Sequence, residues 1–406
     1  MPIHSSDPVV IAGAGPSGLA LALRLGLAGL PCLVLEAEPA LTHDLRAGAF
    51  HPPTVEMLAE LGLEKDILKR GIKVPVWQIR DRIDGVVAEF DLSLLSDVTR
   101  FPYRLHLEQH RLTPLLLDRI RQAAPSVTVK FGTAVEDVTQ DATGVTLQAG
   151  GGSIRASFLI GCDGAKSVVR QSLKISFDGF TWPERFLVAS TTFDLATLGF
   201  AGAGYVADPE HWAAVFRVPD DGPPGLWRIA YGTDPELPEP DVLAPHEIQA
   251  RLKIILEHAL PQADDFALKY ASTYRVHQRV AGRFCAGRVA IAGDAAHINN
   301  PLGGFGLNGS IHDAMNLGEK LIEIWHNGAD YNVLFDLYDR QRRPINIKAV
   351  QTMSIRNKRL LEEKDPAIRK VSLDEVRATA ADSDKARAYL LNTSMINSVR
   401  EAAAIR

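Results

Sequence analysis

The stretch Val9–Glu36, VVIAGAGPSGLALALRLGLAGLPCLVLE, predicts the fold of this chain. It begins with a β-branched run that is typical of a buried parallel strand and continues into the loop Gly13–Gly18, which has the spacing GxGxxG. A helical stretch rich in leucine and alanine follows, and a second apolar strand ends at Glu36. Strand, glycine loop, helix, strand and acid in this order indicate a βαβ unit that binds a dinucleotide.

Each residue of this motif has a physical role. Gly13 permits the tight turn, Gly15 lets the backbone approach a pyrophosphate, and Gly18 lets helix and strand pack closely. The helix N-terminus offers unpaired N–H groups to an anion, and Glu36 is placed to accept a hydrogen bond from a ribose hydroxyl. The alternative, a structural glycine turn in an ordinary α/β protein, does not account for the acid at the end of the second strand.

Composition limits the class of protein. A chain of 406 residues exceeds the usual size of one hydrophobic core, so we expect at least two domains. The net charge of -5 gives no electrostatic reason to expect a nucleic-acid partner. Cys32, Cys162 and Cys285 lack zinc-site spacing, so we expect no metal and a reducing compartment. Without a basic, apolar leader or a membrane-length apolar run, the sequence predicts a cytoplasmic protein with no membrane partner.

Pattern also predicts local structure outside the motif. Residues 76–92 alternate in polarity around Asp84-Gly85 and predict a β-hairpin. Residues 180–276 are rich in proline and glycine, with short strands at close intervals, and indicate an antiparallel sheet with a covering helix at Glu247–Leu260. Thr54 is a candidate N-cap, as is Ser372, which has capping-box spacing to Glu375. A charged helix is expected over residues 330–356, with a kink or a restart at Pro344.

Two further motifs follow buried strands. They are GCDGAKSVVR at Gly161–Arg170 and GRVAIAGDAAHINNPLGGFGLN at Gly287–Asn308. Asp163 and Asp294 would lie at the carboxyl ends of parallel strands, where they suit a ligand with several hydroxyl groups. A pair of helix N-caps is the alternative, above all for Asp294.

The loop Pro301–Asn308 contains three glycines and so leaves room for a flat ring beside the backbone. The helix that follows is expected to begin near Leu307–Gly309. Its positive end would then favour negative charge on that ring.

Together, GAGPSG with Glu36 and these two motifs resemble the FAD-dependent aromatic hydroxylases. This is the single-component, class A family of flavoprotein monooxygenases built like p-hydroxybenzoate hydroxylase, and the resemblance covers roughly residues 7–345. RAGAFHPPTVEML at Arg46–Leu58 and LEQHRLTPLL at Leu107–Leu116 also match. The resemblance implies an α/β fold in which a Rossmann-type FAD-binding domain contains an inserted antiparallel-sheet substrate domain, with helices at the C-terminus. The expected division is residues 1–75, 105–179 and 277–345 for the FAD-binding domain, 76–104 and 180–276 for the substrate domain, and 346–406 for the C-terminal helices.

The resemblance further implies a reaction. FAD would be bound tightly but non-covalently, and NADH or NADPH would bind transiently to reduce it. O2 would then add at the flavin C4a position, and the resulting hydroperoxide would hydroxylate the substrate. The substrate would be a phenol, hydroxybenzoate, aniline or hydroxypyridine, and the reaction would serve aromatic compound catabolism. Asp294 would meet the ribityl chain, and Asp163 would lie near the pyrophosphate and serve both FAD and NAD(P)H. The implied cofactor-binding residues are Gly13, Gly15, Pro16, Ser17, Gly18, Glu36, Ala37, Arg46, Gln109, Val135, Asp163, Gly293, Asp294, Pro301, Gly304, Gly306, Leu307 and Asn308.

Candidates for substrate contact lie in the antiparallel region. They are Tyr205, His211 and Arg217, although residues of these types are more often core or surface residues than ligand contacts. The family resemblance leaves open a larger substrate, such as a natural product, quinone precursor or drug, and also a non-catalytic FAD-binding regulator. It leaves open a monomer or a homodimer. The WxWxIP signature associated with flavin-dependent halogenases is absent.

Overall fold

Residues 7–42, 48–220, 225–256 and 266–406 are described in the computed structural model of the chain. The first of its sheets has six strands in the order β18-β19-β12-β1-β2-β8 and is parallel except where β18 pairs with β19. Its strands are β1 (Val9–Ala12), β2 (Cys32–Leu35), β8 (Val127–Lys130), β12 (Phe158–Gly161), β18 (Cys285–Ala286) and β19 (Val289–Ile291). In the centre, Val10 of β1 lies opposite Leu33 of β2 and Leu159 of β12. The βαβ prediction is therefore confirmed.

Helices and two small sheets surround this sheet. Helix α1 (Pro16–Leu27) packs against α4 (Gln109–Ala123) and against the long helix α8 (Phe305–Asn327). The other helices here are α2 (Pro52–Glu60), α3 (Glu64–Arg70), α5 (Val168–Ser172) and α9 (Tyr331–Ile345). The small sheets have the orders β3-β7-β4 and β11-β10-β9, from β3 (Ala49–Phe50), β4 (Ile72–Val74), β7 (Arg104–His106), β9 (Val135–Gln140), β10 (Val145–Ala149) and β11 (Gly152–Ala156).

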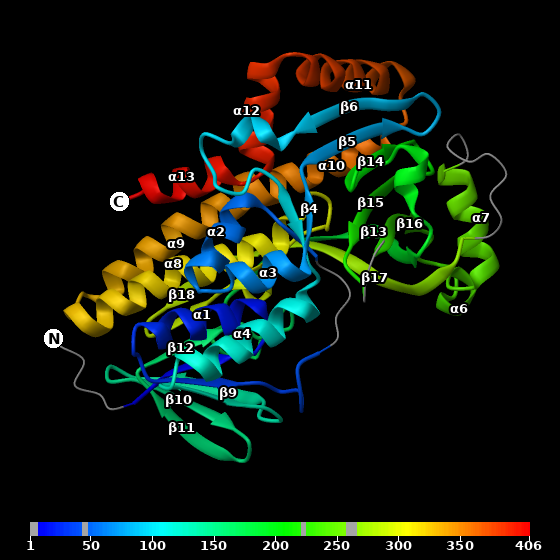
Figure 1. Ribbon diagram of the computed structural model, residues 1–406. Helices are drawn as coiled ribbons and strands as arrows, with labels where there is room; N and C mark the ends of the chain where they lie inside the picture. Colours follow the sequence, from blue (N-terminus) through cyan, green and yellow to red (C-terminus); the bar gives the residue numbers. More distant parts are fainter. Residues whose placement is uncertain (1–6, 43–47, 221–224, 257–265) are drawn as a thin grey trace.

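The second large sheet lies beside the first (Figure 1) and has eight strands in the order β20-β17-β13-β16-β15-β14-β5-β6. They are β5 (Val76–Asp81), β6 (Gly85–Asp91), β13 (Phe177–Thr191), β14 (Ala203–Ala207), β15 (Ala213–Val218), β16 (Leu226–Thr233), β17 (Leu268–Ala281) and β20 (His297–Ile298). β5 and β6 form the predicted hairpin, and β5 joins β14 in parallel. On one face, Trp227 and Ile229 pack against Leu252 of α7 (Pro245–Leu256). A short helix, α6 (Glu239–Val242), precedes α7.

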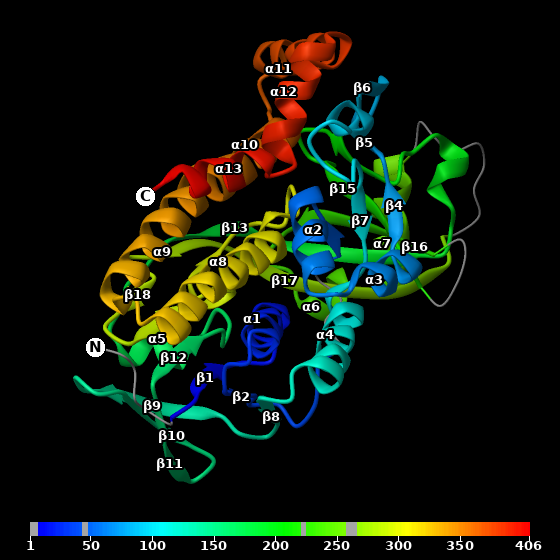
Figure 2. The ribbon, with the colours of Figure 1, turned by 60° about the vertical axis from the view of Figure 1, so that its left-hand side comes forward.

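The C-terminal helices lie against the hairpin of β5 and β6 and against α9. They are α10 (Thr352–Glu362), α11 (Pro366–Ala381), α12 (Ser383–Thr393) and α13 (Ile396–Ala404). Figures 1 and 2 show α11 and α12 beside β5 and β6, and α13 packs against α9. The chain's end therefore helps to enclose the second sheet from the side opposite α7. The α/β architecture with an antiparallel sheet and C-terminal helices agrees with the predicted fold class.

Several local predictions are wrong, and the reasons are physical. His51, not Thr54, is the N-cap of α2, because Pro52 has the fixed φ that suits the first helical position. Ser372 lies inside α11, whose N-cap is Asp365. Helix α8 begins at Phe305, ahead of the expected start, since Gly304 adopts φ +70° and turns the chain into the helix.

Other element limits differ from those expected. Pro344 lies inside α9, which ends one residue later at Ile345, and a π-helical stretch at Asn346–Gln351 connects it to α10. Strand β13 begins at Phe177, ahead of residue 180, where we expected the antiparallel sheet to begin. The division into six parts remains a prediction.

Among the helices of the described ranges, none combines the length and apolar character that a bilayer span requires. The same part of the chain holds no group of three His, Cys, Asp or Glu side chains placed to share a metal ion.

Candidate active site

The glycine loop is packed tightly on one side and open on the other. A Cβ atom at Gly13 would lie 2.4 Å from the Cys162 carbonyl oxygen, and one at Gly18 would lie 2.0 Å from the Gly13 carbonyl oxygen. At Gly15 the same atom would have nothing within 4 Å. The loop thus presents bare backbone and the N-terminus of α1 to open space, which is the arrangement that a pyrophosphate needs.

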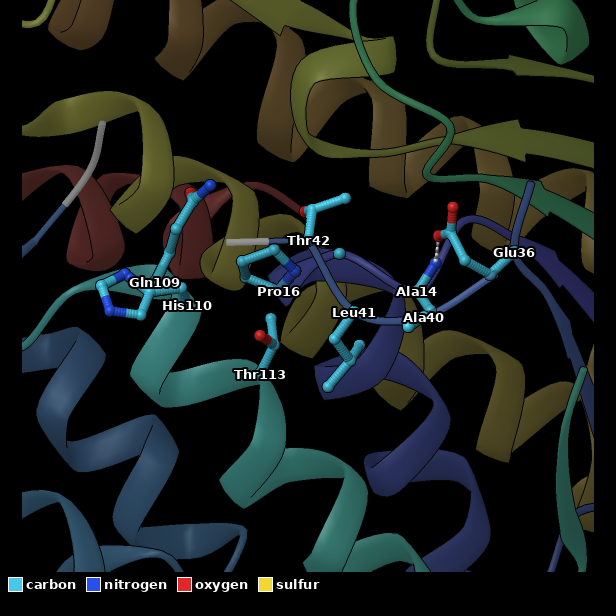
Figure 3. A pocket seen from close by; sticks show the side chains of 10 residues that line it. Ala14, Pro16, Glu36, Ala40, Leu41, Thr42, Gln109, His110 and Thr113 are labelled. Carbon is cyan, nitrogen blue, oxygen red and sulfur yellow. Dashed lines mark hydrogen bonds between the residues drawn. The ribbon is translucent and has the colours of Figure 1, made fainter. Parts of the chain in front are cut away.

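Glu36 lies at the rim of a pocket in front of this loop (Figure 3). The Ala14 N–H donates to Glu36 Oε2 at 2.6 Å and the Glu38 N–H donates to Oε1 at 3.0 Å, so the backbone fixes the carboxylate. A carboxylate has lone pairs beyond these two bonds and can accept from a ligand hydroxyl as well. The pocket brings together four of the residues predicted for the cofactor, and it is lined by Ala14, Gly15, Pro16, Glu36, Ala40, Leu41, Thr42, Gln109, His110 and Thr113.

The two motif aspartates differ in their surroundings. Asp163 accepts from Ser167 Oγ at 2.6 Å and from the Val169 N–H at 3.1 Å, so its carboxylate holds the start of α5, and burial raises its pKa. Asp294 is exposed, whereas Gly293 and Ala295 on either side of it are buried, and it lies in a 3-10 turn whose N-cap is Ala292. The N-cap of α5 is Ser167, whose Oγ accepts from the Arg170 N–H at 2.9 Å, so neither aspartate is itself a helix N-cap.

A buried network fixes the segment around Asp294. Asp313 of α8 accepts from the Gly293 N–H at 3.1 Å and binds His297 Nε2 and Arg342 Nε, each at 2.7 Å. Burial alone would raise the pKa of Asp313, but Arg342 and His297 outweigh it and lower this pKa to about 2. Ser17 Oγ donates to the Ser310 carbonyl oxygen at 3.2 Å, which joins α1 to α8.

The glycine loop at residues 301–306, called the ring loop below, leads into α8. Gly303 and Gly304 have φ of +109° and +70°, which side chains disfavour. Asn308 Oδ1 accepts from the His51 N–H at 2.8 Å and from Thr54 Oγ1 at 2.6 Å, while its Nδ2 donates to the Ala49 carbonyl oxygen. Asn308 therefore clamps the ring loop to α2 with its side chain. Of the other predicted residues here, Pro301 is exposed, and Gly306 and Leu307 are half-buried.

The ring loop is joined directly to the second sheet. Asn357 Nδ2 of α10 donates to the Tyr205 hydroxyl at 3.3 Å and to the Leu302 carbonyl oxygen at 3.4 Å. The Tyr205 ring meets Trp77 edge to face at 4.6 Å, and burial raises the pKa of its hydroxyl. Tyr205 and Trp77 therefore form a buried surface of the second sheet that faces the ring loop. This surface is called the wall below.

Sequence analysis missed three polar residues near this wall, namely His51, Arg104 and His106. Arg104 is 4% exposed and its guanidinium lies 4.0 Å above the Trp77 ring. His51 stacks on Phe305, and its Nε2 lies 2.8 Å from the Gly303 carbonyl oxygen. Burial, reinforced by Arg104, lowers the pKa of both histidines, that of His106 to about 4. The one available signal was the alternation of Arg104 and His106 about Leu105.

The other two substrate candidates lie elsewhere. His211 contacts Arg251 of α7, and its N–H donates to Asp208 Oδ1 at 2.7 Å. The Arg217 guanidinium lies 6.0 Å from the Trp227 ring, on the face that α7 covers. The structure does not bring these two side chains to the ring loop.

The remaining predicted positions are more peripheral. Val135 begins β9 and is nearly buried, and Ala37 is exposed just after β2. Arg46 lies outside the described residues.

The open face at Gly15, the pocket at Glu36, the exposed Asp294 and the ring loop together fit an extended dinucleotide that ends in a flat ring, as FAD does.

Comparison with known proteins identifies the family. A model described as an FAD binding domain matches residues 6–353. The chain is 38% identical to para-nitrophenol 4-monooxygenase of Pseudomonas sp. strain WBC-3 over 98% of both chains. It is 34% identical to 6-hydroxy-3-succinoylpyridine 3-monooxygenase HspB of Pseudomonas putida strain S16, over 93% of this chain and 95% of that one. The crystal structure of p-nitrophenol 4-monooxygenase PnpA from Pseudomonas putida DLL-E4 superposes with a TM-score of 0.90 at 35% identity, covering 97% of this chain and 98% of that one.

Since the family match spans most of the chain and these relatives are similar along nearly all of it, the chain belongs to the FAD-dependent aromatic hydroxylases and is an FAD-dependent monooxygenase.

Proposed function

We propose that this protein uses NAD(P)H and O2 to hydroxylate a small phenol with a single ring. The observation that carries the proposal is the buried contact between the ring loop and the wall, where Leu302 of the loop and Tyr205 and Trp77 of the wall are all nearly buried. Asn357 joins this wall to the ring loop. Because Asn357 ties Tyr205 to Leu302, we expect a single ring to bind with that bridge in place and a polycyclic substrate to require that it opens.

The residues of the chain have distinct parts in the proposed reaction. Gly15, Glu36 and Asp294 would hold FAD, which supplies the transfer of electrons to oxygen. The N-terminus of α8 brings partial positive charge to the ring loop and favours negative charge there. The buried side chains around Tyr205 keep water from the reacting ring, which protects the oxygen-transfer step from side reactions.

NAD(P)H would bind at a basic surface beside Asp163. Burial chiefly lowers the pKa of Arg170 and of His277. Arg279 lowers both further, and Arg275 also lowers that of His277. Arg279 and, on the same strand, Arg275 thus extend positive charge from the motif Gly161–Arg170, whose own Arg170 is buried. A dinucleotide carries a pyrophosphate that would neutralise this charge.

The proposed setting is the cytoplasm, where NAD(P)H is regenerated and where the three free cysteines would stay reduced. The protein would act there as a monomer or a homodimer.

The test is oxygen-dependent oxidation of NADH and NADPH by the FAD-loaded protein. Phenol, 4-nitrophenol, 4-hydroxybenzoate, aniline, 2-hydroxypyridine and a polycyclic phenol would be compared, with products identified by mass. We expect stimulation by single-ring phenols and a product in which the ring has gained an oxygen. Stimulation by the polycyclic phenol or aniline alone would overturn the proposal. Reduction of FAD by neither nucleotide would instead favour the non-catalytic FAD-binding regulator.

A further inference from the structure

We propose that Arg104, His106 and His51 form the site for the phenol oxygen of the substrate, in which Arg104 donates to the oxygen and His106 Nε2 accepts its proton. This inference rests on the proposed function and names the groups that would ionise the substrate.

Strand register puts the three side chains on one face of a small sheet. Arg104 and His106 are two positions apart on β7, so both point to the same side. Ala49 lies opposite His106 and Phe50 opposite Leu105, so the next residue, His51, comes opposite Arg104. Directly opposed residues of antiparallel strands share a face. The mutual electrostatic effect of His51, Arg104 and His106 agrees with this placement.

Arg104 is a buried cation with no anion. Within the described ranges no carboxylate forms an ion pair with it, and its Nε has no hydrogen-bond partner. Its electrostatic neighbours besides the two histidines are the hydroxyls of Tyr205 and Tyr389. A buried charge without an opposite charge nearby is unfavourable, and a ligand that arrives as or becomes an anion would compensate it. The side chain is therefore suited to a phenolate oxygen.

The hydrogen-bond partners of the two histidines fix their tautomers. His106 Nδ1 lies 2.6 Å from the Arg217 carbonyl oxygen, which can only accept, so Nδ1 carries the hydrogen and Nε2 the lone pair. The same argument at Gly303 leaves the lone pair of His51 on Nδ1. His106 Nε2 and His51 Nδ1 are both buried, and neither has a partner in the part of the chain that the structure describes. Each ring thus offers an unused acceptor.

A guanidinium donor beside imidazole acceptors is selective for a hydroxyl. A phenol O–H can donate to His106 Nε2 while its oxygen accepts from Arg104. A carboxylate or nitro group only accepts, and it has no hydrogen for the imidazole lone pair. His51 has its other nitrogen bonded to the ring loop and positions that loop against the site.

The proton transfer balances without another reactant. The phenol O–H bond breaks, its electron pair stays on the oxygen, and an N–H bond forms at His106 Nε2. The product is a phenolate between the Arg104 guanidinium and an imidazolium. The new anion raises the pKa of His106, because an adjacent negative charge favours the charged ring. The phenolate has the more electron-rich ring, which prepares it for attack by an electrophilic oxygen.

The experiment uses 4-nitrophenol, whose phenolate is yellow and whose phenol form is not. The FAD-loaded protein would be titrated without NAD(P)H, about one pH unit below the pKa of the free probe, and the flavin spectrum subtracted. We expect wild-type protein to bind the probe as phenolate. With His106→Gln, the bound probe should stay in the phenol form, and the optimum of kcat should move to higher pH.

Arg104→Met should weaken binding of the probe at least tenfold and abolish its ionisation, and Arg104→Lys, which keeps the charge, should restore part of both. FAD content and circular dichroism would establish folding, and His106→Gln carries the test if Arg104→Met does not fold. His246→Gln is the control, because His246 is 81% exposed and distant on α7.

Two outcomes separate the inference from the proposed function. If phenols are hydroxylated but the bound probe is not ionised, or if His106→Gln ionises it as wild type does, the inference is overturned and the function stands. If no phenol binds or stimulates NAD(P)H oxidation, the proposed function fails and takes the inference with it.

Discussion

Asp313 of α8 and Arg342 of α9 form an ion pair at 2.7 Å, with both side chains almost completely buried. The same carboxylate also binds the Gly293 N–H and His297, so this pair supports the turn that carries Asp294. A pair of charges inside the protein is costly to break, because the remaining partner loses its compensation without regaining water. The segment that would hold the cofactor thus depends on a contact between two helices.

Replacement of Asp313 by alanine should therefore destabilise the protein severely. We expect a loss of about 3–5 kcal/mol in the free energy of unfolding, measured by urea denaturation of the FAD-loaded protein. Asp336→Ala is the matched control, because Asp336 pairs with Arg340 on the surface of α9 and such pairs contribute roughly 0–1 kcal/mol. Equal losses from the two substitutions would contradict the prediction.

The same carboxylate should make stability depend on acid pH. Its pKa is lowered to about 2 from an ordinary 3.8, so the folded protein binds the proton less readily than the unfolded chain does. The resulting stabilisation is fully present above about pH 4 and is lost as the pH falls towards 2. Free energies of unfolding across this range should fall more steeply for wild type than for Asp313→Asn. Parallel curves would show that Asp313 does not contribute.

Gly15→Ala and Gly18→Ala should separate cofactor binding from folding. A Cβ atom at Gly15 would have no neighbour within 4 Å. Gly15→Ala should therefore change the free energy of unfolding, measured without added FAD, by no more than about 1 kcal/mol. It should weaken FAD binding at least tenfold in a fluorescence titration, since the methyl group occupies the open face. Gly18→Ala forces a methyl group against the Gly13 carbonyl and should cost roughly 1–3 kcal/mol of stability itself. Tight FAD binding by Gly15→Ala would argue against a pyrophosphate at this loop.

Arg275→Ala tests the basic surface proposed for NAD(P)H. Arg275 is exposed on β17 next to His277. An ion pair between one exposed arginine and the nucleotide contributes about 0.5–1 kcal/mol of binding free energy, so its loss should raise the KM for NAD(P)H roughly two- to fivefold. The kcat should change little, and the KM should become less sensitive to salt. Arg377→Ala on α11 serves as the control. An unchanged KM and salt dependence would place the nucleotide elsewhere.

Local sequence was sufficient for several features. The βαβ unit follows from a glycine spacing set between two apolar runs, and the hairpin at Asp84-Gly85 follows from alternation around a turn. The ends of the helices were harder to predict, because a single residue can decide where a helix begins. Thr54 has the right chemistry for an N-cap, yet Pro52 starts the helix earlier and the Thr54 hydroxyl binds Asn308 instead.

The dinucleotide-binding unit, the α/β class and the resemblance to flavoprotein hydroxylases could all be read from the sequence, because glycine spacing and apolar periodicity are local properties of the chain. Which polar residues meet at the ring loop depends on contacts between segments that lie far apart in the chain. Tyr205 came to this wall, whereas His211 and Arg217 point to α7. Arg104 and His51 are brought together by the register of two short strands, and a shift of one residue would turn each side chain to the opposite face.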